Sequence, residues 1–420
     1  MQEKMLIKGG NKLVGCIDVQ GAKNATLPIM AASILLKDQT LRLNNVPNLQ
    51  DIRTMSALLC NLGADVQYKD QTMVIFVPET LKSEAPVELV RKMRASSLVL
   101  GPLVARNGRA VLPLPGGCVL GSRPLDFHFK GLTKMGATIE LEHGSVYATA
   151  KELKGAKITL DFPSVGATEN LMMAATLAKG TTYIENAALE PEILNLADVL
   201  RSMGAKITGD GTNVIEIIGQ KSLCSATGDI IPDRIEAATY LLAGLITKGS
   251  VTVSGINPNY LEQIITKLEE ANVSIDINND AITASWNDSI RGVSVKTLPH
   301  PGFPTDIQPQ LMALLTLTPG TSVINESVFD SRLLHVDEFK KMGAKIEIQD
   351  NVAIVTGVSK ITGATVHSSN LRAGAALILM GLAAEGETVV CDLHHVWRGY
   401  ENMVDKLLSL GANITLLEDE

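Results

Sequence analysis

The sequence has few cysteines, no excess of positive charge and no long apolar run, and each absence excludes a class of protein. Its five cysteines stand singly at positions 16, 60, 118, 224 and 391, so we expect free thiols in a reducing compartment rather than a disulfide framework. The net charge is -8. Because nucleic acid binding usually needs a basic face, we expect no nucleic acid partner.

Signals of metal enzymes and of exported proteins are also missing. The seven histidines include the adjacent pair His394 and His395, but no HExxH or CxxC pattern accompanies them, so we expect no metal site. The N-terminal stretch MQEKMLIKGGNKL is charged and lacks the apolar core of a signal peptide. The apolar run at residues 373–384 is too short to span a bilayer. We therefore expect a cytoplasmic protein without membrane insertion.

What the sequence does contain is an internal repeat. A Gly-Ala pair that follows a helix-like segment recurs five times, at Gly63, Gly136, Gly204, Gly343 and Gly411. A sixth copy has Asn272 in the glycine position, and asparagine is the next best residue for a left-handed helix end. Successive copies lie about 70 residues apart, so six units fill the chain.

Each unit begins with an apolar segment that predicts a buried helix, at residues 25–36, 96–105, 167–178, 235–247, 307–317 and 371–384. A β-like run, an amphipathic helix and a hairpin follow in each unit. This alternation indicates the α/β class, and six units of this size suit two domains of three. The polar stretch at residues 225–232 is the expected boundary.

The second unit differs from the others by about four extra residues after its β-like run, at PLPGGCVLGSRP, residues 113–124. This glycine-rich loop places Cys118 near Arg123, and a nearby guanidinium lowers a thiol pKa toward neutrality. Such a thiol suits a proton donor or nucleophile. The alternative is a small apolar filler in a surface turn. An insertion confined to one unit favours a functional Cys118.

Polar residues also gather at the starts of the buried helices, namely Lys23-Asn24, Arg94, Ser164, Asp233-Arg234, Thr305-Asp306 and Asn370 to Arg372. Arg332 and Arg398 stand in later loops. Any one of them alone could be a helix cap or a surface ion pair. As a set they supply guanidinium groups at equivalent places, where helix N-termini also favour anions. We expect a small, multiply charged anion such as a phosphorylated carboxylate.

At these residues the sequence resembles the UDP-N-acetylglucosamine 1-carboxyvinyltransferases, enolpyruvyl transferases of early peptidoglycan synthesis. The resemblance spans nearly the whole chain and runs through GAKNATLP, PGGCVLGSRPLDFH, PSVGATEN, FPTDIQPQ, NLRAGAAL and RGYENMVDKLLSLGANI. It implies a two-domain inside-out α/β barrel with three repeats in each domain. The implied domains are residues 22–231, which carry the cysteine loop, and residues 1–21 with 232–420, with the active site in the cleft between them.

The resemblance also implies a reaction, the transfer of the enolpyruvyl group of phosphoenolpyruvate to the 3′-hydroxyl of UDP-N-acetylglucosamine with release of phosphate. It requires no cofactor, its partners are these two small molecules, and we expect a monomer. Cys118 would be the proton donor and Asp306 would orient or deprotonate the sugar hydroxyl. Phosphoenolpyruvate would be held by Lys23, Asn24, Arg123, Arg398, Arg332 and Arg372. The nucleotide sugar would contact Arg94, Arg123, Pro124, Leu125, Asp126, Phe127, Phe162, Pro163, Ser164, Val165 and Val328.

Three residues depart from the family pattern. Asn370 and Trp397 stand where the family usually has aspartates, and Phe162 stands where some members have lysine beside the uracil. An amide cannot act as a base, so Asn370, counted with the substrate-binding residues, leaves two alternatives open. One is a catalytically weak paralogue that binds the nucleotide sugar as a regulator. The other is an enolpyruvyl transferase for a different acceptor, such as shikimate 3-phosphate.

Overall fold

The computed structural model describes residues 3–114 and 125–417, which divide into two compact units. We call residues 21–114 with 125–231 the N-terminal unit, and residues 3–20 with 232–417 the C-terminal unit. Each unit has its own hydrophobic core, and the two cores share no residue. The loop predicted to carry Cys118, with Arg123 and Pro124, lies outside the described residues.

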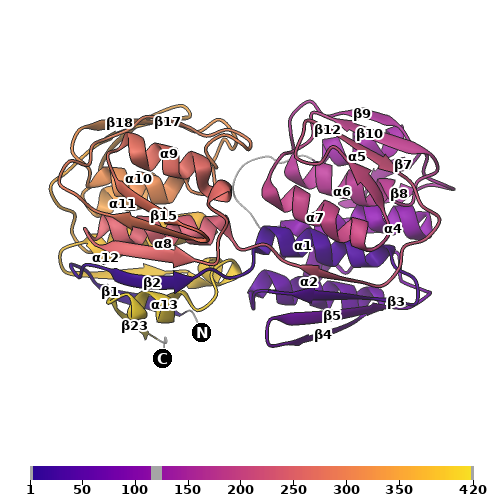
Figure 1. Ribbon diagram of the computed structural model, residues 1–420, viewed down its shortest axis with the longest axis horizontal. Coiled ribbons are helices and arrows are strands. Elements are labelled where there is room, and N and C mark those ends of the chain that lie inside the picture. The colour runs from indigo at the N-terminus through magenta and orange to yellow at the C-terminus, as the bar shows by residue number, and fades with distance from the viewer. Residues whose placement is uncertain (1–2, 115–124, 418–420) are drawn as a thin grey trace. The chain divides into compact units, whose positions relative to one another are not determined.

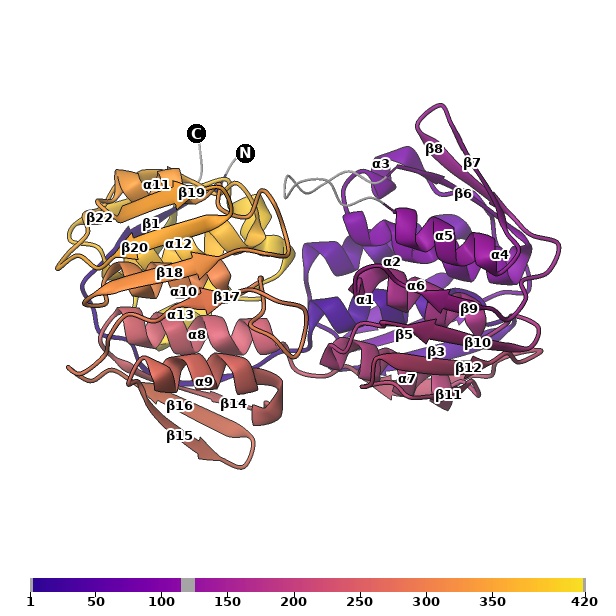
Figure 2. The ribbon, with the colours of Figure 1, turned by 90° about the horizontal axis from the view of Figure 1, so that it is seen from above.

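Each unit is built around buried helices, as the apolar segments predict. In the N-terminal unit these are α1 (Lys23–Ala32), α4 (Leu100–Asn107) and α6 (Val165–Ala175), with the 3₁₀ helix η1 (Ser33–Leu35) after α1 and η2 (Arg94–Val99) before α4. In the C-terminal unit they are α8 (Arg234–Ile246), α10 (Gln308–Thr316) and α12 (Leu371–Ala383). Every residue of α8 is buried. Figures 1 and 2 show α8, α10 and α12 packed together inside the C-terminal unit.

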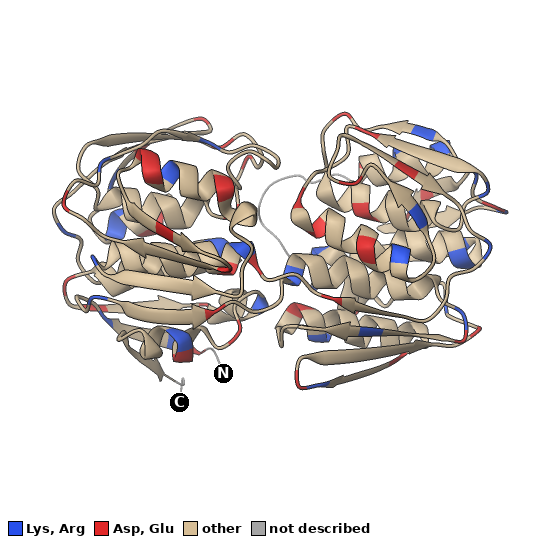
Figure 3. Ribbon diagram, viewed as in Figure 1, with Lys and Arg blue, Asp and Glu red and all other residues tan. Residues whose placement is uncertain are grey.

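Charged residues avoid the middle of these three central helices (Figure 3). Arg234 and Glu236 lie in the first turn of α8, Arg372 lies in the first turn of α12, and α10 carries no charge. A charge buried in the middle of a helix bundle would be costly without a partner, so the sequence keeps charge at the helix starts. Those starts are where the predicted site residues lie.

In the described part of the chain, strands surround the helices in six separate sheets with one shared plan. In the N-terminal unit the sheet orders are β13-β3-β5-β4, β6-β8-β7 and β9-β10-β12-β11; in the C-terminal unit they are β2-β14-β16-β15, β17-β18-β20-β19 and β21-β22-β1-β23. In the four-stranded sheets, the first strand runs parallel to the second and the rest pair antiparallel. The predicted arrangement of helices inside and strands outside is confirmed, with sheets that remain separate rather than closing into one barrel.

The strands of these sheets are short, and most contain five residues. In the N-terminal unit the strands are β3 (Gln39–Asn44), β4 (Asp65–Lys69), β5 (Thr72–Val77), β6 (Arg109–Pro113), β7 (Thr138–Glu142), β8 (Ser145–Thr149), β9 (Lys157–Thr159), β10 (Thr181–Glu185), β11 (Lys206–Thr208), β12 (Val214–Ile218) and β13 (Ala226–Asp229). In the C-terminal unit they are β1 (Lys4–Lys8), β2 (Val14–Asp18), β14 (Ser250–Ser254), β15 (Ser274–Asn278), β16 (Ala281–Ser285), β17 (Val295–Lys296), β18 (Thr321–Asn325), β19 (Lys345–Gln349), β20 (Val352–Thr356), β21 (Thr365–His367), β22 (Glu387–Cys391) and β23 (Asn413–Leu417).

The N-terminal strands complete two sheets of the C-terminal unit. In the sheet of the sixth repeat, β1 lies between β22 and β23, in the place that the second hairpin strand holds in the other four-stranded sheets. Strand β2 likewise pairs parallel to β14 of the fourth repeat. Residues 3–20 and 232–417 therefore form one unit, because β1 and β2 pair with strands of the sixth and fourth repeats.

The amphipathic helices lie on the outside and end as the Gly-Ala signals predict. They are α2 (Gln50–Leu62), α5 (Asp126–Lys134), α7 (Pro191–Ser202), α9 (Glu262–Glu270), α11 (Val336–Lys341) and α13 (Met403–Ser409), with the short α3 (Val87–Val90) and η3 (Pro258–Leu261) besides. The Gly or Asn of each signal follows its helix within two residues and has a positive φ, from 96° to 115° at the five glycines and 63° at Asn272. The left-handed helix end is confirmed in all six repeats, including the drifted one.

Two chain segments join the units, at residues 20–22 and 231–233. Within the N-terminal unit, Ala22 donates its backbone N–H to Ile231 at 2.7 Å, and within the C-terminal unit Asp233 donates to Gln20 at 2.8 Å. A Cβ at Gly21 would lie 1.8 Å from the carbonyl oxygen of Asn45, so only glycine allows this close approach.

Candidate active site

The predicted site residues that the structure describes fall into two groups, one in each unit. The N-terminal unit holds Lys23, Asn24, Arg94, Leu125, Asp126, Phe127, Phe162, Pro163, Ser164 and Val165. The C-terminal unit holds Asp306, Val328, Arg332, Asn370, Arg372 and Arg398. Each group is described by itself.

In the C-terminal unit, Asp306 lies between two buried guanidinium groups. Arg332 Nη2 donates to Asp306 Oδ1, and Arg372 Nη2 donates to Asp306 Oδ2 at 2.9 Å. The arginine side chains are only 2% and 5% exposed, whereas that of Asp306 is 27% exposed. Both carboxylate oxygens are therefore fixed from the protein side while part of the group stays open to solvent. The structure brings together three residues that the sequence places 26 to 66 positions apart.

Arg372 is held by a buried polar network as well as by Asp306. Its Nη1 donates to the hydroxyl of Tyr400 at 3.4 Å, and its guanidinium lies 5.7 Å from the centre of the Tyr400 ring. Burial alone would lower the pKa of Arg372, but the charge of Asp306, followed by Tyr400 and Asp233, raises it above the ordinary value. Arg372 therefore stays charged beside the carboxylate.

The Tyr400 hydroxyl is itself fixed by two side chains. Gln310 Nε2 donates to it at 3.2 Å, and it lies 2.9 Å from Thr239 Oγ1. Because the Thr239 hydroxyl already donates to the carbonyl of Ile235, Tyr400 is the donor to Thr239. This network extends from the Asp306 cluster into the helical core, so Arg372 has little freedom to move.

Asn370 is the N-cap of helix α12, two residues before Arg372. Its Oδ1 accepts hydrogen bonds from the backbone N–H groups of Arg372 and Ala373, both at 3.1 Å, and its Nδ2 donates to Ser369 Oγ at 3.2 Å. Asparagine and aspartate cap helices about equally well. The residue that departs from the family pattern therefore keeps the capping function and lacks only the negative charge.

Trp397, the second departure, binds the N-terminal segment. It lies with Arg398 in the 3₁₀ helix η4 (Leu393–Arg398), and its Nε1 donates to Glu3 Oε2 at 2.7 Å. Arg398 is half-buried. This hydrogen bond ties η4 to the residue directly before β1.

Sequence reasoning missed one residue of this unit, the buried Glu326, which is 1% exposed. It follows strand β18, and its carboxylate accepts four hydrogen bonds, from the hydroxyls of Thr297 and Thr305 and from the backbone N–H groups of Val328 and Phe329. An acidic residue after a strand normally indicates a solvated turn. Only its place between two predicted site residues, Asp306 and Val328, could have drawn attention to it.

In the N-terminal unit, Lys23 begins helix α1 and is nearly buried. Its Nζ lies 3.4 Å from Asp51 Oδ2, at the start of α2, and the two side chains are 11% and 5% exposed. A cation next to a helix N-terminus opposes the helix dipole, so the paired Asp51 compensates for the charge of Lys23. Asn24 follows in the same turn and is half-buried.

His128 anchors the start of helix α5, and with it Leu125, Asp126 and Phe127. Asn170 Nδ2 donates to His128 Nδ1 at 2.8 Å, and Asn170 also accepts from the backbone N–H of Gly101 at 2.6 Å. Burial, and then the charge of Arg94, lowers the pKa of His128 to about 3. The imidazole is therefore neutral, with its proton on Nε2, and ties α5 to α4 and α6.

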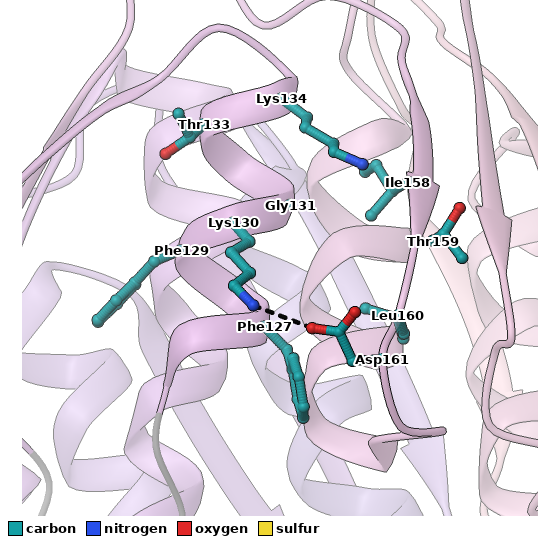
Figure 4. Close-up of a pocket in the computed structure, with 10 residues that line it drawn as sticks. All are labelled: Phe127, Phe129, Lys130, Gly131, Thr133, Lys134, Ile158, Thr159, Leu160 and Asp161. Atoms are coloured by element: carbon teal, nitrogen blue, oxygen red, sulfur yellow. Dashed lines mark hydrogen bonds and ion pairs between the residues drawn. The ribbon is translucent and has the colours of Figure 1, made fainter.

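A cavity of about 430 Å³ lies in the N-terminal unit between α5 and the segment 158–161 (Figure 4). Phe127 lines it, and Lys130 Nζ lies 5.9 Å from the centre of the Phe127 ring and 2.9 Å from Asp161 Oδ2. Phe162 follows directly and is 37% exposed, and Ser164 caps α6 through its hydroxyl. Of the predicted residues, the described lining of this cavity contains Phe127 alone.

Among residues 3–114 and 125–417, no three His, Cys, Asp or Glu side chains gather closely enough to hold a metal ion. Cys16, Cys60 and Cys224 are exposed free thiols, and Cys391 is buried. Within the same described ranges, every helix is too short or too polar to cross a lipid bilayer.

Comparison with known proteins identifies the family. The family model described as EPSP synthase (3-phosphoshikimate 1-carboxyvinyltransferase) matches residues 7–407. UDP-N-acetylglucosamine 1-carboxyvinyltransferase 1 of Staphylococcus aureus (strain N315) is 51% identical over 420 residues, which cover 99% of this chain and 100% of that protein. The chain belongs to the enolpyruvyl transferase family.

Other members of the enolpyruvyl transferase family agree with this assignment. UDP-N-acetylglucosamine 1-carboxyvinyltransferase 2 of Carboxydothermus hydrogenoformans is 50% identical over 419 residues, covering 99% of this chain and 100% of that protein. The enolpyruvyl transferase NikO from Streptomyces tendae superposes with a TM-score of 0.90 at 27% identity, covering 99% of each chain. The EPSP synthase from Acinetobacter baumannii shares the fold, with a TM-score of 0.75 at 19% identity over both whole chains. The predicted enolpyruvyl transferase fold is confirmed.

Proposed function

We propose that this protein transfers the enolpyruvyl group of phosphoenolpyruvate to the 3′-hydroxyl of UDP-N-acetylglucosamine, with release of phosphate, as a step of peptidoglycan synthesis. The observation that carries the proposal is the clamped Asp306, a carboxylate fixed by Arg332 and Arg372 yet open on one side. It occurs in a chain that is half identical, over its full length, to relatives named for this reaction. No feature of the described residues favours the alternative of a nucleotide-sugar-binding regulator.

In the proposed reaction, Asp306 accepts the proton of the 3′-hydroxyl as the sugar oxygen bonds to C2 of phosphoenolpyruvate. Cys118, outside the described residues, donates a proton to C3 and gives a tetrahedral intermediate. The Cys118 thiolate then takes back a C3 proton while phosphate leaves with the proton held by Asp306, which restores the double bond on the sugar ether. The hydroxyl proton thus ends on phosphate and both side chains return to their starting states, so the exchange balances without a cofactor.

Binding roles follow from the positions of the cations. Lys23, Arg123 and Arg398 would hold phosphoenolpyruvate with Asn24, and positive charge near the leaving phosphate stabilises the transition state. Arg332 and Arg372 would contribute through Asp306, which both of them bind, and through the substrate carboxylate. The nucleotide sugar would contact Arg94, residues 123–127, residues 162–165 and Val328. The free thiols of Cys16, Cys60 and Cys224 suit a cytoplasmic enzyme.

Phosphate release from phosphoenolpyruvate tests the proposal. We expect release to depend on UDP-N-acetylglucosamine and to be absent with shikimate 3-phosphate. Release with shikimate 3-phosphate alone would assign a different acceptor. Tight binding of UDP-N-acetylglucosamine without any phosphate release would instead favour the regulator. Light scattering on the same preparation would test the expected monomer.

A further inference from the structure

Glu326 joins two segments of the C-terminal unit that its four hydrogen bonds hold in place. One segment contains Thr305, whose Oγ1 donates to Glu326 Oε2 at 2.9 Å. The other contains Val328 and Phe329, whose backbone N–H groups donate to Oε1 at 2.9 and 3.1 Å. All four donors are neutral, so hydrogen bonds alone satisfy this buried carboxylate. A carboxylate with no exposed oxygen and four good donors has a single orientation.

Through Thr305, the Glu326 carboxylate reaches the proposed base. The carbonyl oxygen of Thr305 accepts from Arg332 Nε at 3.2 Å and from Arg332 Nη2 at 3.0 Å. The same Nη2 donates to Asp306 Oδ1. Glu326 thus fixes the residue directly before Asp306, and that residue fixes the guanidinium that orients the Asp306 carboxylate.

Through Oε1, Glu326 also shapes the loop that carries Val328. The Thr297 hydroxyl donates to Oε1 at 2.8 Å and in turn accepts from the backbone N–H of Ser327 at 2.9 Å. The Phe329 ring lies 5.7 Å from the Arg332 guanidinium, and the Phe329 carbonyl accepts from the Arg332 backbone N–H at 3.2 Å. The loop 326–329 and the Asp306 clamp therefore share both Glu326 and Arg332.

We propose that Glu326 is a positioning residue that couples binding of the acceptor sugar at Val328 to its deprotonation by Asp306. This inference rests on the proposed function, because it assumes that Val328 contacts the nucleotide sugar and that Asp306 is the base. Because the Glu326 carboxylate positions both the Val328 loop and the Asp306 carboxylate, it fixes the distance between the bound sugar and the base. A displacement of about 1 Å between reacting groups costs about a hundredfold in rate. Arg332 is also a proposed contact of the phosphoenolpyruvate carboxylate, but Glu326 reaches it only indirectly, through Thr305. Because Glu326 binds the backbone N–H of Val328 directly, we expect its main effect on the acceptor.

Two variants separate the path from Glu326 through Thr305 to Asp306 from the path to the loop 326–329. Glu326→Gln keeps the side-chain shape, but an amide has one acceptor oxygen, so either Thr305 or the loop N–H groups must face an NH₂ donor. Thr305→Val removes only the hydroxyl that reaches Glu326 and leaves the loop contacts intact. Glu347→Gln makes the same chemical change at an exposed position of β19 and serves as the matched control.

Steady-state phosphate release with each substrate varied in turn tests the proposal. For Glu326→Gln we expect kcat/KM for UDP-N-acetylglucosamine to fall at least tenfold while KM for phosphoenolpyruvate changes less than twofold. Thr305→Val should lower kcat with little change in the acceptor KM, and adding it to Glu326→Gln should cost little more, because both remove one contact. Glu347→Gln should behave as the parent.

Two results would overturn the role of Glu326. One is that the parent is active and that Glu326→Gln and Thr305→Val keep its kcat/KM for UDP-N-acetylglucosamine. The other is an equal rise of KM for both substrates in these variants, which would indicate a general structural role. A parent without any turnover would refute the proposed function and this role together, so the two failures are distinguishable. If Glu326→Gln does not fold, Thr305→Val alone decides the outcome.

Discussion

Replacement of Asp306 by asparagine removes a carboxylate that two buried guanidinium groups share. Arg332 and Arg372 are 2% and 5% exposed, so their charges cannot be solvated in place. The amide offers one oxygen and one NH₂ group to two guanidinium donors, so one arginine faces a donor. Breaking a buried ion pair costs about 3 to 5 kcal/mol. The partial exposure of Asp306 reduces this, and we expect a loss of about 2 to 4 kcal/mol in unfolding free energy.

The same substitution removes the proposed general base, which is worth about a hundredfold to ten-thousandfold in rate. Urea unfolding at neutral pH measures the first effect, and phosphate release under saturating substrates measures the second. Asp276→Asn, at an exposed position of β15, is the matched control and should change neither. An Asp306→Asn protein that loses less than about 0.5 kcal/mol and keeps kcat within about threefold of the parent would refute the clamp and the base together.

Further predictions concern the departure from the family, the acid and the buried histidine. Asn370→Asp should fold as the parent, because asparagine and aspartate both cap α12. We expect it to raise kcat, and an unchanged kcat would show that a negative charge at position 370 does not contribute to turnover. Cys118→Ala should abolish phosphate release whereas Cys60→Ala should not, and equal activity would exclude the thiol acid. The pKa of His128 is about 3 against 6.5 unfolded, so the stability from neutral His128 is complete above pH 6.5 and falls below it. Urea unfolding at pH 7.5 and 5.5 should show this loss, about 1.4 kcal/mol per pH unit at most, reduced in His128→Gln.

Local signals in the sequence predicted much of the fold. The Gly-Ala pairs mark helix ends because a left-handed residue is needed there, and even Asn272 adopts the expected positive φ. The six apolar segments became the buried helices because a helix that is apolar all round has no face for water. Pairing of β1 with β22 and β23 could not be predicted, since its partners lie at the other end of the chain.

The candidate site was predicted less completely. Asp306, Arg332 and Arg372 were each singled out as polar residues at helix starts or in loops, but only the fold shows that the two guanidinium groups bind one carboxylate. Glu326 and His128 escaped notice because burial, rather than residue type, makes them important. A glutamate after a strand reads as a solvated residue until its four hydrogen-bond donors are known.

The central claim is the transfer of a three-carbon group onto UDP-N-acetylglucosamine. Incubation with phosphoenolpyruvate labelled at C3 with carbon-13, followed by NMR of the nucleotide-sugar product, tests it most directly. The account predicts one labelled vinyl CH₂ group, bonded through C2 to the 3′-oxygen, with an equal amount of free phosphate. Label that stays in phosphoenolpyruvate, or that appears on shikimate 3-phosphate in a mixture of both acceptors, would contradict it.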